Sequence, residues 1–376
     1  MKKTALYPWH EAAGACFAPF AGYEMPIRYP RGAVEEHRLT RRSAGLFDID
    51  HMGRLLISGP GAGEKLSPLV SGRILDMREG EARYNLLLNE SGGIRDDLFI
   101  YRLENDSWFV VVNAGNREAD AAYLREGLAH PVVVEDVSGD TCMIALQGPR
   151  AVPLLDKLSG GAVSKTRRSS MITGAIGEFP VRIGRTGYTG EDGAELFYDA
   201  DRAADLWELL LREAAAAGIE AGPVGLAARD SLRFEAGMPL HGHEISPSIT
   251  PPEALLSWAC DFEKDFIGRE AILAKKAAGL TRRLATINVS GGVPREDYPV
   301  INEAGTEIGR CAAGMFCPTA GTYSANVLLP PEYTAPGTKL GILIRGTPKE
   351  AVVVKRPLYI PAYRKQKGGV IINTSC

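Results

Sequence analysis

The sequence lacks the patterns typical of metal-binding, disulfide-rich and membrane proteins. Its six cysteines are scattered from Cys16 to Cys376 with no close Cys-x-x-Cys pair, so we expect neither a zinc site nor a disulfide framework. The one close pair of histidines, His241 and His243, has no third ligand nearby in sequence. No apolar run reaches membrane-spanning length, and the first residues contain no apolar core of signal-peptide length. We therefore expect a cytoplasmic protein with reduced thiols and no bound metal.

A run of positive charge is also missing. The 43 Lys and Arg residues are interleaved with 46 Asp and Glu residues, and the formal net charge is −3. A nucleic-acid-binding protein would need a clustered positive face. We therefore expect no nucleic-acid partner and no membrane partner. An anionic small ligand held by one or two arginines remains compatible with this balance.

Turn-forming residues are abundant, with 42 glycines and 24 prolines in 376 residues, and they favour considerable sheet. The length exceeds that of one comfortable core, so two or three domains are expected. Short strands at regular spacing from 283 to 355 predict a small β-barrel or sandwich as the last domain. Upstream, hydrophobic spacing predicts helices at 33–45 (with Gly45 as the cap), 116–125, 150–158, 203–217 and 224–237, a turn-like segment at 46–53, and strands at 54–58, 83–88, 98–103, 107–113, 141–146, 178–185 and 194–198.

The stretch from Ser91 to Tyr101 combines turn chemistry, two acids and a strand. Gly92 and Gly93 suit a tight turn, and Asp96 and Asp97 stand at the start of the strand expected from residue 98. Neighbouring residues of an extended chain point to opposite faces, so at most one of the two carboxylates faces a given pocket. Such a carboxylate is well placed to orient a substrate or accept a proton. From these residues alone, the favoured interpretation is the alternative, that both acids cap the turn or face water.

Three further segments carry polar residues at turns. The Gly-rich stretch 59–63 fits neither the dinucleotide fingerprint nor the P-loop, and we interpret it as a strand-to-helix turn. The loop 186–193 presents Tyr188 and two acids, Glu191 and Asp192, which we expect to be solvated. Arg229 and Arg233 lie four residues apart on an expected helix and so share one face.

Several of these segments, in this order, resemble the glycine cleavage T-protein family, the folate-dependent aminomethyltransferases. The resemblance extends from about residue 6 to residue 365. Single motifs are weak, but their collinear set is specific for the superfamily. The motifs that carry it are Phe47-Asp-Ile-Asp-His-Met-Gly53, Gly92-Gly-Ile-Arg-Asp-Asp-Leu98, Val111-Val-Asn-Ala114, Leu146-Gln-Gly-Pro149, Arg185-Thr-Gly-Tyr-Thr-Gly-Glu-Asp-Gly193, Gly225-Leu-Ala-Ala-Arg-Asp-Ser-Leu-Arg-Phe-Glu-Ala236 and Thr250-Pro-Pro-Glu-Ala254 with Ser257-Trp258.

The resemblance implies an α+β fold, a three-domain, cloverleaf-like aminomethyltransferase arrangement with tetrahydrofolate in a central funnel. Residues 1–275 would form the folate-binding region from two interwoven α+β subdomains. Residues 276–365 would form the C-terminal β-barrel domain, and 366–376 a tail.

The resemblance also implies roles for individual residues. The second acid of the Gly-Gly-x-x-Asp-Asp motif, here Asp97, would face the folate near N5 and N10 as the catalytic carboxylate. Glu195 would hold the pterin edge, and Arg229 is the arginine of the Ala-Arg-Asp motif. Arg364, with Lys365 as the neighbouring choice, would meet the anionic glutamate tail. The remaining folate contacts would be Met52, Tyr84, Tyr101, Asn113 and Tyr188.

Those residue types suit the chemistry. A carboxylate such as Glu195 can pair with a pterin edge in a bidentate manner, and flat rings favour apolar and aromatic walls. The residues alone leave other interpretations open: Tyr84 and Tyr188 as core tyrosines, Met52 as core filler, and Arg229 as half of a buried ion pair with Asp230 or Glu195.

The implied function is transfer of the aminomethyl group from the lipoyl arm of a partner H-protein to tetrahydrofolate. The alternative is a folate-dependent demethylase acting on a small methylated substrate. A third hypothesis, a folate-binding accessory protein, ranks last because its Lys-Gly-Cys-Tyr-like segment is missing. The family usually has Ser where Asp50 stands and an aromatic residue where Met238 stands, and both positions are expected near the folate pocket, where they bear on donor specificity.

Overall fold

The structure, a computed structural model, describes residues 1–365, so the expected tail at 366–376 lies outside the described residues. Contacts divide the chain into two compact units. The first unit contains Met1–Leu66, Ile74–Tyr84 and Leu98–Leu232. The second contains Ser67–Arg73, Asn85–Asp97 and the chain from Arg233 onward.

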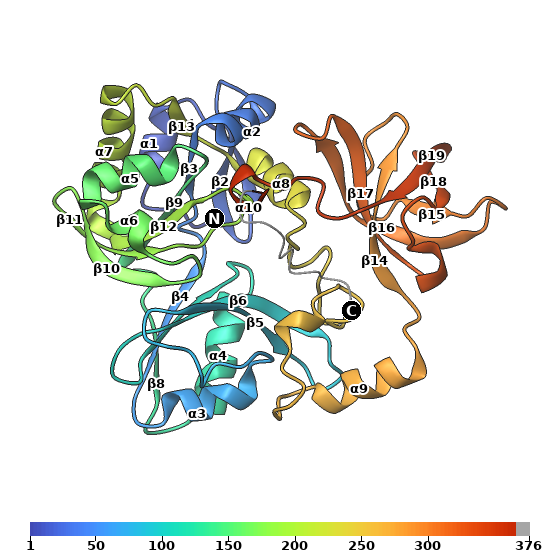
Figure 1. Ribbon diagram of the computed structural model, residues 1–376, viewed down its shortest axis with the longest axis horizontal. Helices are drawn as coiled ribbons and strands as arrows, with labels where there is room; N and C mark the ends of the chain where they lie inside the picture. Colours follow the sequence, from blue (N-terminus) through green and yellow to red (C-terminus); the bar gives the residue numbers. More distant parts are fainter. Residues whose placement is uncertain (366–376) are drawn as a thin grey trace. The chain divides into compact units, whose positions relative to one another are not determined.

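A six-stranded sheet forms the centre of the first unit (Figure 1). Strand β3 lies next to the edge of the sheet, between the antiparallel strand β9 and the parallel edge strand β13. The strand order is β10 (Met171–Ile176), β11 (Phe179–Gly184), β12 (Gly193–Asp199), β9 (Thr141–Gln147), β3 (Ala44–Asp48) and β13 (Ala221–Pro223).

Strand β3 corrects two sequence predictions. Helix α2 (Ala33–Arg42) ends before Gly45, and the first part of the expected turn at 46–53 is a strand. All five residues of β3 are buried, so the strand lacks the alternation that marks a half-exposed one. Gly45 is required by close packing, because a Cβ there would lie 2.3 Å from Thr40 Oγ1.

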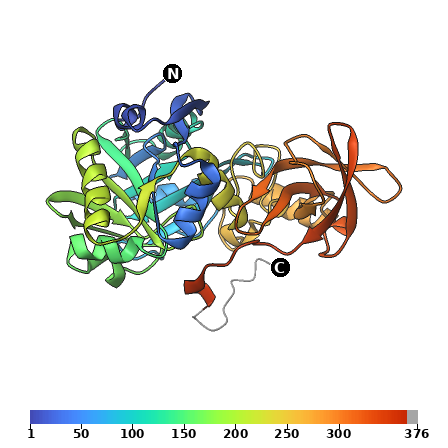
Figure 2. The same cartoon turned by 90° about the horizontal axis from the view of Figure 1, so that it is seen from above.

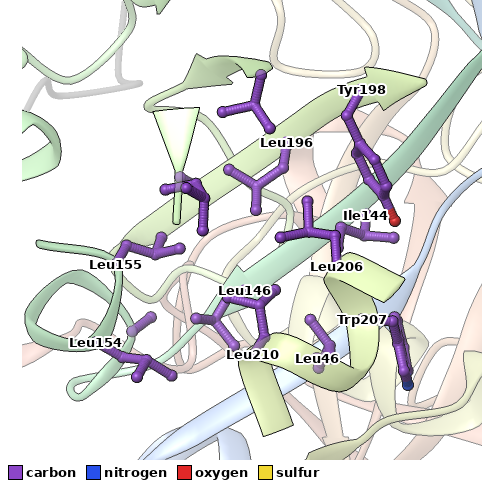
Figure 3. Close-up of a cluster of buried hydrophobic side chains, with 14 of the residues drawn as sticks. Leu46, Ile144, Leu146, Leu154, Leu155, Leu196, Tyr198, Leu206, Trp207 and Leu210 are labelled. Carbon is purple, nitrogen blue, oxygen red and sulfur yellow. The ribbon is translucent and has the colours of Figure 1, made fainter. Parts of the chain in front are cut away.

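The core of this unit lies between the sheet and helices α5 (Ala151–Ser159) and α7 (Ala203–Ala216). Helix α7 presents Leu206, Trp207 and Leu210 along one side, the spacing of an amphipathic helix. Figure 3 shows these side chains beside those of Leu146 and Leu196 from the sheet. Full burial of such a side chain contributes about 1.5–3 kcal/mol.

A second, five-stranded sheet has the order β5 (Ala82–Leu88), β6 (Ile94–Arg102), β7 (Trp108–Val112), β4 (Gly53–Ser58) and β8 (Val133–Asp136). The expected β5–β6–β7 meander is therefore confirmed. Strands β5 and β6 each continue from one unit into the other. Because β6 already begins at Ile94, Asp96 and Asp97 lie inside a strand and not in front of one.

The turn before β6 is fastened within the second unit. The side chain of Asn89 accepts a hydrogen bond from the Gly93 amide at 2.8 Å. The Ile94 amide donates to Ser246 O and Ile249 O, each at 3.0 Å. A Cβ on Gly93 would lie 1.8 Å from the carbonyl oxygen of Pro247. Glycine is thus needed there because another backbone segment passes close by.

Six strands of the second unit form a closed barrel (Figure 2). They surround a core that includes Ile287, Val300, Val327 and Ile342. The expected C-terminal β-barrel and the α+β class are confirmed. In barrel order the strands are β14 (Arg283–Val289), β17 (Thr322–Leu329), β16 (Glu307–Cys317), β15 (Pro299–Ile301), β18 (Lys339–Ile344) and β19 (Thr347–Val354).

The remaining α-helices and strands of the described residues lie outside the two sheets and the barrel. They are α1 (Tyr7–Ala12), β1 (Cys16–Phe20), β2 (Tyr23–Arg28), α3 (Ala62–Leu66), α4 (Arg117–Leu128), α6 (Ala162–Lys165), α8 (Leu226–Glu235), α9 (Arg269–Ala278) and α10 (Ala362–Lys365). Within residues 1–365, no helix is long and apolar enough to cross a membrane, and no group of three or more metal-ligating side chains is gathered.

Candidate functional site

Strand β6 separates the two acids of the Asp-Asp pair. Asp96 is fully buried, whereas Asp97 is only partly buried. Alternate residues of a strand share a face, so Asp97 lies on the same face of β6 as Phe99 and Tyr101. The sequence argument that only one acid of the pair points to a given side holds for this strand.

A hydrogen-bonded chain links the buried Tyr101 and Glu195 through the partly buried Thr186. Thr186 Oγ1 donates to Glu195 Oε2 at 2.5 Å, and the Tyr101 hydroxyl lies 2.8 Å from Thr186 Oγ1 and 3.4 Å from Glu195 Oε2. Burial raises the pKa of Glu195, while hydrogen bonds from Thr186 and Tyr101 and the charge of Arg229 oppose the rise. Burial, together with the charge of Glu195, raises the pKa of Tyr101 well above its usual value. Tyr101 is therefore a neutral phenol.

Arg229 of helix α8 is the positive charge next to this chain. Its guanidinium carbon lies 4.7 Å from the centre of the Tyr188 ring, within the range of a cation–π interaction. Burial and the charge of Arg229 lower the pKa of His51 to about 3, so that imidazole is neutral. Among the described residues, no hydrogen-bond partner meets the buried His51 Nδ1.

Apolar and aromatic side chains line the same face of β6. Met52 and Phe99 pack against the buried cluster that contains Tyr101. The Tyr84 ring meets the Phe99 ring edge-on, with centroids 5.9 Å apart. Strand β4 begins at Gly53 and β7 ends at Val112, and these two residues are paired. Met52 and Asn113 therefore emerge at the same end of that ladder.

The loop that carries Tyr188 is held at several points. The side-chain amide of Gln147 donates to Thr186 O at 3.1 Å and accepts from Thr189 Oγ1 at 3.1 Å. Glu191 is buried in an ion pair with Arg41, with Nη1 and Oε1 2.9 Å apart. The prediction that Glu191 is a solvated turn acid is therefore wrong.

The same prediction is wrong for Asp192. Its carboxylate forms ion pairs with Arg185 at 2.7 Å and with Arg168 at 2.5 Å. Although burial acts to raise it, these hydrogen bonds hold the pKa of Asp192 below its usual value. Both acids thus fasten the loop to the rest of the unit.

Comparison with known proteins identifies the family. The GCVT N-terminal domain matches residues 6–264, and the glycine cleavage T-protein C-terminal barrel domain matches residues 282–359. The chain belongs to the glycine cleavage T-protein family. The resemblance noted in the sequence is confirmed.

Curated relatives of this T-protein family member align over nearly its whole length. It is 39% identical over 361 residues to an aminomethyltransferase of Desulforamulus reducens, covering 96% of this chain and 98% of the relative. It is 41% identical over 368 residues to an aminomethyltransferase of Herpetosiphon aurantiacus, covering 97% and 100%. Among solved structures, the glycine cleavage system aminomethyltransferase T of Bartonella henselae superposes with a TM-score of 0.89 at 35% identity, covering 96% and 98%. The expected aminomethyltransferase fold is thereby confirmed.

The structure brings most of the expected T-protein residues together in the first unit. Contacts described above connect Tyr101, Glu195, Arg229 and Tyr188. Tyr84 lies on β5, and Met52 and Asn113 lie directly before β4 and directly after β7. Asp97 and Arg364 belong to the second unit. Arg364 lies on the exposed short helix α10, with its guanidinium 5.9 Å from the centre of the Tyr363 ring.

Asp50, a departure from the T-protein pattern, has an internal role. Its carboxylate accepts hydrogen bonds from Arg54 Nη2 at 3.0 Å, from the Met143 amide at 3.2 Å and from the Ala5 amide at 3.2 Å. These contacts tie the carboxylate to the protein interior.

Sequence reasoning did not single out Thr186, Arg41, Gln147 or His51. Thr186, Gln147 and His51 stand inside motifs already noted for other residues, so the motifs were the available signal. Arg41 had no such signal, because its partners lie roughly 150 and 190 residues away in the chain.

Proposed function

We propose that this chain is an aminomethyltransferase that moves the aminomethyl carbon from lipoylated H-protein to tetrahydrofolate. The products would be 5,10-methylenetetrahydrofolate, ammonia and the reduced lipoyl arm. The observation that carries the proposal is the hydrogen-bonded Glu195–Thr186–Tyr101 chain beside Arg229, in a member of a family whose curated relatives are named aminomethyltransferase.

The first-unit residues fit a pterin. Both described hydrogen bonds to Glu195 end on Oε2, and a carboxylate fixed in this way can accept paired N–H groups of a pterin edge. Tyr101 and Tyr188 would contact its rings, with Met52 and Tyr84 as apolar walls. Asn113 would add a polar contact, and Arg364 would meet the anionic tail of tetrahydrofolate.

Asp97 would be the catalytic carboxylate. When bound, tetrahydrofolate supplies the amine that receives the one-carbon unit. A carboxylate on the partly exposed side of β6 can stabilise positive charge that develops on the transferred carbon, and it can hold a proton during release of ammonia. Holding two reactants in a productive geometry contributes up to about 7–11 kcal/mol in well-oriented reactions.

The partner would be a lipoylated H-protein. The five free cysteines of the described residues support a cytoplasmic location. The barrel strands from Arg283 to Val354 support the barrel domain proposed at 276–365. The folate-binding region proposed at 1–275 differs from the contact units, which group 67–73, 85–97 and the chain from Arg233 onward with the barrel.

The test is an activity screen with matched variants. The forward reaction is measured with aminomethyl-lipoyl H-protein and tetrahydrofolate, and parallel arms supply small methylated donors. Turnover with H-protein supports the proposal, whereas turnover only with a methylated donor favours a demethylase.

Asp97→Asn is the variant that tests the carboxylate. We expect it to lower kcat by about 10²–10³-fold, the size of losing one charge-stabilising group. Its circular dichroism spectrum should stay unchanged. Asp96→Asn is the matched control on the other face of β6. If the control loses turnover and Asp97→Asn does not, the assignment of Asp97 is wrong.

A further inference from the structure

Arg41 joins two segments of the first unit that are far apart in the chain. Its side chain projects from α2 and is only 8% exposed. Nη1 donates to Thr189 O at 2.7 Å and to Glu191 Oε1 at 2.9 Å, and Nη2 donates to Leu232 O at 3.2 Å. One guanidinium therefore bonds both the loop after β11 and the helix α8.

Those two segments carry the Tyr188–Arg229 pair. Thr189 directly follows Tyr188, and Leu232 lies three residues after Arg229, about one helical turn along α8. Arg41 therefore bonds the loop and the helix close to the Arg229 guanidinium and the Tyr188 ring, which lie 4.7 Å apart.

Two other residues of α2 form hydrogen bonds at different positions along α8. Glu36 Oε2 accepts a hydrogen bond from the Gly225 amide at 2.8 Å, just before the first turn of α8. His37 Nδ1 lies 2.7 Å from Ser231 Oγ. Because these contacts fix the helix independently, loss of Arg41 releases chiefly the loop. The buried Glu191, whose side chain is only 4% exposed, would then lose its ion pair with Arg41.

We propose that Arg41 is a positioning residue that sets the Tyr188–Arg229 pair for tetrahydrofolate, an inference that rests on the proposed function. Its ion pair with Glu191 adds to the contacts of Gln147 and Asp192 that hold the loop, and it also joins the loop to α2. A lysine would carry the charge but present a single ammonium in place of the planar fork that meets three acceptors. Arg41 itself makes no contact with the ligand in this proposal.

The test compares Arg41 with its neighbour Arg42. Arg42 lies on the same helix and is ion-paired to Glu220 and Glu35, but its side chain is 42% exposed. Arg41→Met and Arg41→Lys are compared with Arg42→Met and Arg42→Lys. Hydrogen exchange of the backbone amides of residues 187–191 is measured on the free protein. Calorimetry then gives the tetrahydrofolate Kd, and turnover with H-protein gives kcat and KM.

For Arg41→Met we expect at least about tenfold faster exchange in residues 187–191 and an unchanged rate in α7. The Kd and KM for tetrahydrofolate should rise about tenfold or more, with a smaller fall in kcat, because a misplaced binding group weakens the complex. Arg41→Lys should recover part of the affinity, and both Arg42 variants should match the wild type.

Wild-type exchange and wild-type Kd in Arg41→Met would overturn the proposal, as would equal effects in the Arg41 and Arg42 variants. Faster hydrogen exchange throughout the protein, with an unchanged tetrahydrofolate Kd of the folded fraction, would show that the role of Arg41 is merely structural. If Arg41→Met does not fold, Glu191→Gln takes its place with the same readouts. If the wild type itself binds no tetrahydrofolate, the proposed function fails, and the exchange rates alone decide whether Arg41 fixes the loop.

Discussion

The ion pair between Asp50 and Arg54 gives a stability prediction that can be worked from the structure. The Arg54 side chain is fully buried, and Asp50 Oδ1 lies 3.0 Å from its Nη2. Asp50→Ser, which installs the residue expected at this position, would remove the carboxylate. Arg54 would keep its hydrogen bonds to the carbonyl oxygens of Asp50, Met52, Ser138 and Thr141.

The loss of stability expected for Asp50→Ser depends on the contacts that Arg54 keeps. Burial raises the pKa of Asp50, while Arg54 opposes the rise, so the intact pair is no strong source of stability. Removing one partner of a buried pair nevertheless costs about 3–5 kcal/mol, because the other charge stays buried and uncompensated. Four carbonyl acceptors partly compensate Arg54, so we expect the lower end, about 3 kcal/mol.

The assay is urea unfolding followed by circular dichroism at neutral pH, extended to a double-mutant cycle with Arg54→Gln. The double variant should be more stable than the sum of the single losses predicts, by about 1–3 kcal/mol, because it leaves neither charge of this pair buried without the other. Asp205→Asn is the control, since Asp205 forms an exposed pair with Arg202, and it should change stability by less than about 0.5 kcal/mol. A loss below about 1 kcal/mol for Asp50→Ser, or strict additivity, would refute the reasoning.

Two further predictions concern Glu195 and Gly93. Because burial raises the pKa of Glu195, folding favours its protonated form. The resulting contribution of Glu195 to the stability of the folded protein is fully present below the pKa of the unfolded state, near 4.3. It is lost as pH rises through the pKa of the folded state. Glu195 loses its proton over the same pH range, and the resulting carboxylate is the form that accepts pterin N–H groups. Tetrahydrofolate affinity should therefore increase with pH above about 4.3. In Glu195→Gln, the Kd measured by calorimetry should depend much less on pH. A pH-independent wild-type Kd would contradict this. Gly93→Ala should destabilise the protein by about 1–3 kcal/mol in thermal unfolding, since its Cβ would meet Pro247 O, whereas Gly139→Ala, with open space around it, should not.

The elements with clear periodicity were predictable. Helix α7 has its apolar residues at i, i+3 and i+4, and the observed helix ends within one residue of the expected range. The barrel strands likewise followed from short apolar runs between turns. Strand β3 could not be predicted in this way, because both of its faces are covered and its composition resembles that of a buried turn or helix. The start of β6 was missed because Gly92 and Gly93 suggested a longer turn than the structure has.

At the candidate site, the partners of the charged side chains could not be predicted from the sequence. Motifs identify which residues occur in order, but the partner of a charged side chain depends on contacts between distant segments. Glu191 and Asp192 are adjacent acids in a loop, a pattern typical of solvated turns, yet each is paired with an arginine from another segment. Only the tertiary fold places Arg41 near Glu191, about 150 residues away.

Asp50 illustrates why a departure from a family pattern should be judged with its neighbours. Taken alone, an acid where Ser is usual suggests a changed donor site. The structure gives that acid a buried counter-charge four residues later, in Arg54, together with two backbone amides. Paired with the Arg54 guanidinium, the Asp50 carboxylate adds no unpaired charge to the turn that carries His51 and Met52. The substitution therefore changes how the turn is held, and differences in donor choice should be sought among residues that are not tied to such a partner.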